Sequence, residues 1–178
     1  PSGSGKSTLL LTVGGMQRPS KGSVAVAGVD VYQMSSRGRG RFRAEQIGFV
    51  FQLFHLLPYL TVLDNVALGG ADKDRTRAAE LLEQFGLADR RQQDPTTLSA
   101  GERQRVALAR AMMGNPALIL ADEPTGNLDP ENARVVLKCL AEFCNQGGTV
   151  LLVTHGEEAN TVADRKCVLE KGRLVVSS

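Results

Sequence analysis

The first eight residues have the composition of a loop that binds phosphate groups. They read Pro-Ser-Gly-Ser-Gly-Lys-Ser-Thr and run into the apolar segment Leu9-Leu10-Leu11. Glycine has no Cβ, so the backbone can wrap closely around a polyphosphate with its N–H groups pointing inward. A helix that starts near Lys6 adds the positive end of its dipole. We therefore predict that these residues bind nucleotide phosphates: Ser2, Gly3, Ser4, Gly5, Lys6, Ser7 and Thr8.

Lys6 and Ser7 have separate tasks in this prediction. The loop ends in Gly-Lys-Ser, the closing half of the P-loop pattern, in which the lysine reaches the β- and γ-phosphates and the hydroxyl ligates Mg²⁺. The alternative is a Gly/Ser turn that only caps a helix. The full pattern starts with a glycine one position before Pro1 and follows a buried strand. We therefore expect this chain to be a fragment of a longer protein whose N-terminal strands are missing.

A pair of carboxylates follows an apolar run farther along the chain. Asp122 and Glu123 come directly after the segment that ends at Ala121, which is the Walker B arrangement. Asp122 would hold Mg²⁺ through a water, since this ion keeps much of its hydration shell. Glu123 would accept a proton from the attacking water or orient it. The alternative is that the pair caps the following turn.

A second segment has the features of an anion site. Ser99 and Gly101 lie where a helix is expected to begin, and the match runs from Leu98 to Ala111. Ser/Gly helix caps are common, so ordinary capping is the alternative. The segment resembles the signature motif of ATP-binding cassette (ABC) ATPases, usually written LSGGQ. Ala100 replaces the usual glycine, and Glu102 replaces the usual glutamine and suits a first helical turn.

Other residues match the landmarks of the ABC family in the expected order. Gln52 matches the Q-loop glutamine, which the resemblance identifies as a ligand of Mg²⁺ and water. Asp129, in Asn127-Leu128-Asp129, matches the D-loop that crosses the dimer interface. His155 matches the switch histidine that contacts the γ-phosphate, whereas we interpret His55 as structural. The resemblance covers essentially the whole chain.

The resemblance also implies a mechanism. Two such domains pair head to tail, and each ATP lies between one P-loop and the opposite Ser99 and Gly101. The chain would be the ATP-hydrolysing subunit of a membrane transporter, peripheral at the cytoplasmic face of the inner membrane. Residues 53–59 would lie close to a separate transmembrane permease. Residues 49–52, 57–58 and 125–129 are similar to the lipoprotein-releasing, macrolide-exporting and cell-division (FtsE-like) group.

Two other classes of ABC protein remain as alternatives. Soluble members that act on DNA commonly carry long insertions, and the span from Gln52 to Ser99 has no room for one. Members that act on ribosomes usually carry two cassettes. A cell-division type of scaffold would use ATP to signal across a membrane. Co-purification with a membrane protein would separate the transporter from the soluble class.

Composition agrees with an ordinary globular protein. The chain has 178 residues, 42% hydrophobic and 22% charged, and its net charge of +2 is too small to favour a nucleic-acid partner. Three cysteines without CxxC spacing indicate reduced thiols. No apolar run reaches the roughly 20 residues that cross a bilayer. Any membrane-spanning part would therefore belong to another chain or domain.

The elements that position these residues follow from the apolar runs. Runs at 47–51, 117–121, 149–153 and 166–169 are typical of buried strands, and helical patterns separate the first three. Such strands indicate an α/β fold with a parallel sheet, in which ligands bind at the carboxyl ends of the strands. The resemblance implies a single P-loop NTPase domain over 1–178, with a RecA-like core. A helical subdomain at about 53–113 and a partial antiparallel β subdomain, including a hairpin at 21–31, would complete it.

Overall fold

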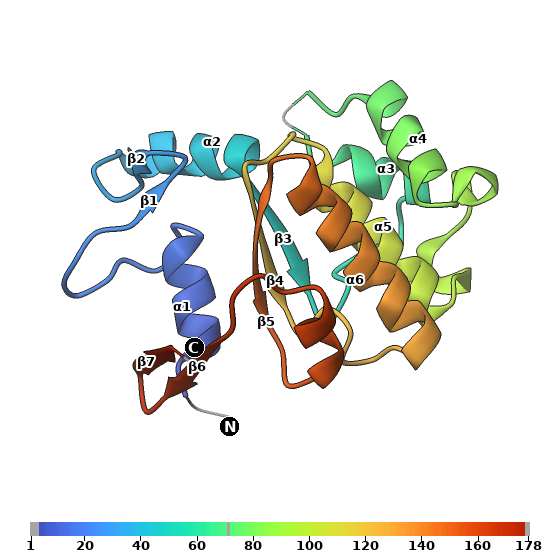
Figure 1. Cartoon of the computed structure of the whole chain (residues 1–178). Helices are drawn as coiled ribbons and strands as arrows, with labels where there is room; N and C mark the ends of the chain where they lie inside the picture. The colour runs from blue at the N-terminus through green and yellow to red at the C-terminus, as the bar shows by residue number, and fades with distance from the viewer. Residues whose placement is uncertain (1–3, 71, 177–178) are drawn as a thin grey trace.

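A parallel sheet of three strands forms the centre of the molecule (Figure 1). The computed structural model describes residues 4–70 and 72–176, so the predicted phosphate contacts Ser2 and Gly3 lie outside the described residues. The strands are β3 (Ile47–Phe51), β4 (Leu118–Asp122) and β5 (Thr149–Val153), in the order β3-β4-β5. This confirms the predicted parallel sheet for three of the four apolar runs.

The register of the sheet determines where the site can form. Phe51 pairs with Asp122, and Asp122 pairs with Val153, so the three strands end side by side. The residues that follow them, Gln52, Glu123 and Thr154, are therefore brought to one edge of the sheet. Parallel strands place their ligand sites at this carboxyl edge.

Both faces of the sheet are covered by helices (Figure 1). Leu118 and Leu120 of β4 belong to a core with Leu10 of α1 (Lys6–Val13). Ile119 and Ala121 belong to the opposite core, with residues of α5 (Ala100–Met112) and α6 (Pro130–Asn145). Alternate residues of a strand point to opposite faces, so an unbroken apolar run is what a sheet buried on both sides requires.

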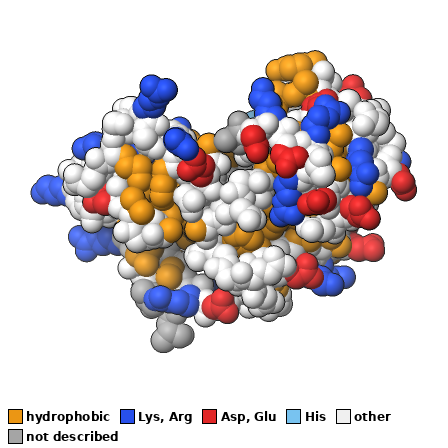
Figure 2. Space-filling view, turned by 90° about the horizontal axis from the view of Figure 1, so that it is seen from above, with side chains coloured by type: hydrophobic (Ala, Val, Ile, Leu, Met, Phe, Trp, Pro, Cys, Tyr) orange, Lys and Arg blue, Asp and Glu red, His pale blue; other side chains and the backbone are white. Residues whose placement is uncertain are grey.

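The segment between β3 and β4 is helical. It contains α3 (Val62–Ala67), α4 (Arg75–Gln84) and the short 3₁₀ helices η1 (Ala88–Arg90) and η2 (Pro95–Thr97). Thr61 and Asp74 cap α3 and α4, because their side-chain oxygens accept hydrogen bonds from backbone N–H groups of the first turn. Basic and acidic side chains are interspersed over this part of the surface (Figure 2). The limits of a helical subdomain at about 53–113 stay a prediction, since α5 packs against β3 as well as against α3 and α4.

Two antiparallel hairpins lie outside the central sheet. β1 (Ala25–Val26) and β2 (Val29–Asp30) form the hairpin predicted for 21–31, joined by Ala27 and Gly28 at positive φ. The run 166–169 does not join the parallel sheet. It lies in β6 (Cys167–Glu170), which pairs with β7 (Arg173–Val176) across a tight turn. A parallel crossover usually contains a helix, whereas β5 and β6 are separated by the short η3 (Glu157–Thr161).

Residues 36–46 form a helix, α2 (Ser36–Gln46), although two glycines interrupt this basic segment. Ser35 caps it by accepting a hydrogen bond from the Gly38 N–H. Within residues 4–70 and 72–176, no helix has the length and apolar character that a bilayer crossing requires.

Candidate nucleotide-binding site

An open pocket of about 520 Å³ lies at the carboxyl edge of the sheet, beside the N-terminus of α1. It brings together residues from four stretches of the chain that are far apart in sequence. Nine of its lining residues were predicted from the sequence as site residues. The lining consists of Ser4, Gly5, Lys6, Ser7, Thr8, Phe51, Gln52, Leu53, His55, Asp122, Glu123 and His155.

The loop before α1 has the shape that an anion site needs. Gly5 adopts a left-handed conformation with φ 97°, and its carbonyl accepts the hydrogen bond from the Leu9 N–H at 2.9 Å. Among the described residues, no side chain caps the N-terminus of α1. The first N–H groups of a helix have no partner within the helix, so they can bind an anion in the pocket. Lys6 Nζ donates a hydrogen bond to the Oγ of the buried Ser4 at 3.2 Å.

Two oxygen ligands predicted for Mg²⁺ meet in this pocket. The Ser7 hydroxyl donates a hydrogen bond to Asp122 Oδ2 at 3.2 Å, although the two residues are 115 positions apart. Mg²⁺ prefers oxygen ligands and is commonly held by one or two side chains together with substrate phosphates. Hydroxyl and carboxylate oxygens at this separation therefore fit the metal that the sequence predicts.

Glu123 is held at the end of β4 by contacts with β5 and with His155, which follows that strand. Its backbone N–H donates to the Val153 carbonyl at 2.8 Å, and its φ of 46° is unusual for a residue with a side chain. Its Oε2 accepts a hydrogen bond from the His155 N–H at 3.2 Å, and His155 Nε2 lies 3.4 Å from Oε1. Oε1 is buried and accepts no hydrogen bond from any described residue. Glu123 also lines the pocket, and an ionised carboxylate is a proton acceptor, so this side chain can act as a base toward a water molecule there.

Gln52 forms a reciprocal pair with Asn127. Gln52 Nε2 donates to Asn127 Oδ1 at 3.3 Å, and Asn127 Nδ2 donates to the Gln52 carbonyl at 3.4 Å. The sequence analysis placed Asn127 in the D-loop but did not foresee this contact, because no local pattern links residues 75 positions apart. The pair connects the end of β3 to the loop that precedes α6.

The segment after Gln52, for which the resemblance implied a place near the permease, also forms a wall of the pocket. Leu53 and His55 line the pocket, and the ring of His55 lies edge-on to Phe51 with centroids 5.2 Å apart. Arg110 of α5 donates to the carbonyls of Phe54 at 2.8 Å and His55 at 2.6 Å. Burial lowers the pKa of Arg110. The only sequence feature that could have predicted their place in the pocket is that they directly follow Gln52.

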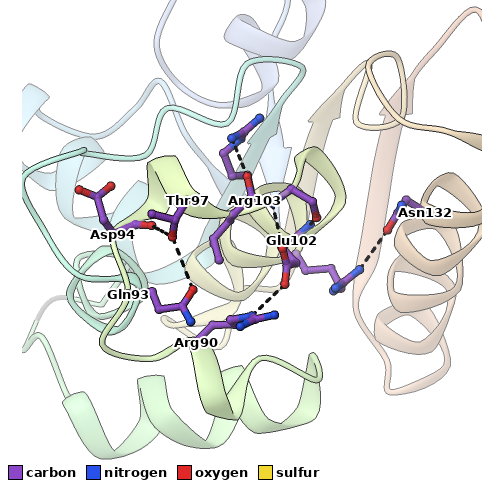
Figure 3. Close-up of polar contacts among 10 residues, drawn as sticks. Arg90, Gln93, Asp94, Thr97, Glu102, Arg103 and Asn132 are labelled. Carbon is purple, nitrogen blue, oxygen red and sulfur yellow. Dashed lines mark hydrogen bonds and ion pairs between the residues drawn. The ribbon is translucent and has the colours of Figure 1, made fainter.

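Three predicted nucleotide contacts lie away from this pocket, at the N-termini of α5 and α6. Ser99 begins α5 in a capping box: its Oγ accepts from the Glu102 N–H at 3.2 Å, and Glu102 Oε2 accepts from the Ser99 N–H at 2.8 Å. Arg90 also donates to Glu102 Oε1 at 3.0 Å, as Figure 3 shows. The hydrogen bond from the Ser99 backbone, with Arg90 as a smaller cause, holds the pKa of Glu102 below its usual value. Gly101 is the second residue of α5.

Asp129, the third of these contacts, caps α6. Its Oδ1 accepts hydrogen bonds from the N–H groups of Glu131 and Asn132, both at 3.0 Å. The bond from the Asn132 backbone is the main reason why the pKa of Asp129 is lowered. Ser99, Gly101 and Asp129 thus lie on helix ends separate from the pocket that holds Lys6.

A sequence profile described as ABC transporter matches residues 1–126 of this chain. The chain is 46% identical to the lipoprotein-releasing system ATP-binding protein LolD of Shewanella oneidensis, over 98% of this chain and 79% of LolD. It is 45% identical to an uncharacterised ABC transporter ATP-binding protein of Mycobacterium tuberculosis, over 98% of this chain and 73% of that protein. Relatives with and without an assigned cargo are thus almost equally similar.

A solved structure has the same fold. It is the dimer of the ATP-binding cassette MJ0796 in a post-hydrolysis state, bound to ADP and Pi. The TM-score is 0.86 with 35% sequence identity, over 99% of this chain and 82% of that chain. The α/β P-loop fold predicted from the sequence is therefore confirmed.

Proposed function

This chain belongs to the ABC transporter family, and we propose that it is the ATP-hydrolysing subunit that powers lipoprotein release through a separate membrane permease. One observation carries the catalytic part: a single pocket contains Lys6, Ser7, Asp122, Glu123 and His155. The lipoprotein cargo is proposed from the 46% identity to LolD.

The chain's own residues suggest how hydrolysis proceeds. The backbone N–H groups at the start of α1 and the Lys6 ammonium bind the triphosphate. Ser7, Asp122 and Gln52 would hold Mg²⁺, which offsets the negative charge of the phosphates when it is bound. Glu123 accepts the proton of the attacking water, and His155 keeps this carboxylate in position from the segment that follows β5.

The remaining predicted contacts support a head-to-tail dimer. Ser99, Gly101 and Asp129 lie on the ends of α5 and α6, away from the pocket of their own chain. We propose that they contact the nucleotide held by the P-loop of a second copy. The dimeric form of the similar cassette MJ0796 supports this arrangement.

The permease would contact the cassette beside Gln52, at the cytoplasmic face of the membrane. Leu53 and Tyr59 are 65% and 77% exposed, the highest values among the large hydrophobic side chains of the described residues. They flank the segment that Arg110 ties to α5. Exposed apolar side chains next to the ATP pocket fit a contact through which a membrane partner would respond to hydrolysis.

Glu123→Gln tests the assigned base. The amide keeps the shape of the side chain but cannot accept the proton, so we expect turnover to fall by at least about a hundredfold. ATP affinity should be retained, and the variant should accumulate as a nucleotide-bound dimer in sedimentation experiments. Glu80→Gln, an exposed change in α4, is the control and should match the parent. Unchanged hydrolysis by Glu123→Gln would refute the assignment.

A further inference from the structure

The side chain of Asn132 fills the space between the beginnings of α5 and α6. It extends from α6 toward α5, as Figure 3 shows. A Cβ added to Gly101 would lie 2.0 Å from Asn132 Oδ1 and 2.3 Å from its Cγ. The side chain of Asn132 therefore packs directly against the backbone of Gly101, and a side chain at position 101 would displace it.

Both ends of the Asn132 amide have a partner. Oδ1 accepts a hydrogen bond from Arg105 NH1 of α5 at 3.2 Å. Nδ2 donates to Asp129 Oδ2 at 2.6 Å, while the backbone N–H of Asn132 donates to Asp129 Oδ1. The partners determine the orientation of the amide, because a guanidinium can only donate and a carboxylate can only accept.

The chemistry of the bridge restricts what can replace Asn132. Aspartate would keep the acceptor toward Arg105 but would turn a carboxylate toward the carboxylate of Asp129. Leucine has a similar size but forms neither hydrogen bond. Only a side chain with an acceptor on one side and a donor on the other links the cation of α5 to the anion before α6.

We propose that Asn132 is a positioning residue that holds Asp129 and Gly101 at a fixed separation, so that both reach the nucleotide of a second copy together. This rests on the head-to-tail dimer proposed above. Asn132 itself would not contact the nucleotide. It lies between Asp129 and Gly101 of its own chain, which would each contact the nucleotide of the second copy. If the bridge is lost, α5 and α6 can shift relative to each other, and the two contacts no longer form at the same time.

The test uses ATP-dependent dimerisation of the full chain in the Glu123→Gln background. Asn132→Asp should raise the dimer dissociation constant by at least about tenfold, because two carboxylates then face each other. The affinity of the monomer for ATP should stay within about twofold, since the bridge is remote from the P-loop pocket. Asn145→Asp, the same change at the exposed far end of α6, is the matched control and should leave dimerisation unchanged.

Asn132→Leu separates the bridge from the added charge. It removes both hydrogen bonds without a new carboxylate and should weaken the dimer in the same way. If only Asn132→Asp weakens the dimer, the added charge and not the bridge is responsible, and the proposal is overturned. Unchanged dimerisation in both variants would also overturn it, as would loss of ATP binding by the monomers. If the Glu123→Gln chain itself stays monomeric with ATP, the proposed dimer has failed rather than the role of Asn132.

Discussion

At the level of single residues, Glu102 shows how a departure from a motif is accommodated. It stands where ABC signature motifs usually have glutamine, and its carboxylate accepts hydrogen bonds from the Ser99 backbone and from Arg90. Either acid or amide can accept the bond from Ser99, but only the acid can also form an ion pair. In return, Ser99 Oγ accepts a hydrogen bond from the Glu102 N–H, which completes the capping box.

Two changes at Glu102 separate the cap from the charge. Glu102→Ala removes the capping interaction and should lower the free energy of unfolding by about 1 kcal/mol in urea. Glu102→Gln keeps the acceptor but loses the ion pair with Arg90, so its effect should be smaller. If Glu102→Gln lowers the free energy of unfolding more than Glu102→Ala does, the capping role is contradicted.

The lowered pKa of Glu102 sets the pH dependence of this difference. Its folded pKa lies below the unfolded value of about 4.3, so the stability it contributes is present above that pH. That contribution is lost as pH falls through the folded pKa. The advantage of the parent over Glu102→Gln in unfolding free energy should therefore shrink from about pH 7 to about pH 3. A constant difference would show that the ionised carboxylate does not matter.

At the level of elements, helix packing depends on glycines that let backbones approach. A Cβ on Gly48 of β3 would lie 2.4 Å from the Ala111 carbonyl oxygen, so α5 can cross the strand only because this residue has no side chain. Gly40, inside α2, has no atom of the described residues within 4 Å of an added Cβ. Glycine is thus needed in β3 so that α5 can pack against it, whereas in α2 it only lowers the stability of the helix.

Replacing Gly40 or Gly48 with alanine should change the free energy of unfolding in opposite directions. Gly40→Ala should raise the free energy of unfolding by about 1 kcal/mol, since alanine favours the helix and loses less backbone entropy. Gly48→Ala should lower it by at least about 2 kcal/mol, because backbone atoms must move apart. Chemical denaturation of both variants measures this. A stabilising Gly48→Ala would show that α5 does not press against β3.

At the level of the whole molecule, the predicted nucleotide contacts fall into two groups. Lys6, Asp122 and Glu123 line one pocket, whereas Ser99 and Asp129 lie on helix ends outside it. In the proposed head-to-tail dimer, each chain would therefore carry two half-sites. Each half-site would meet its complement on the other copy.

Mixing two inactive variants tests this division. Lys6→Ala should abolish ATP binding at the P-loop, and Ser99→Asp should keep the helix cap but repel the partner's triphosphate. Each variant alone should be inactive. An equal mixture should regain about a quarter of parent activity, since half of the dimers are mixed and each of these keeps one intact site. A mixture as inactive as its components would refute shared sites.

The sequence by itself determined the chemistry and the central sheet, because both are written in short segments. Asp122 ends a buried strand and Ser7 lies at the start of a helix, so local patterns were enough to predict that both belong to one site. Only the tertiary structure decided that the run 166–169 pairs within a hairpin, and that Gln52 bonds to Asn127 and Asn132 to Arg105. These contacts depend on how close separate elements approach, and side-chain packing across elements leaves no periodic signal in the chain.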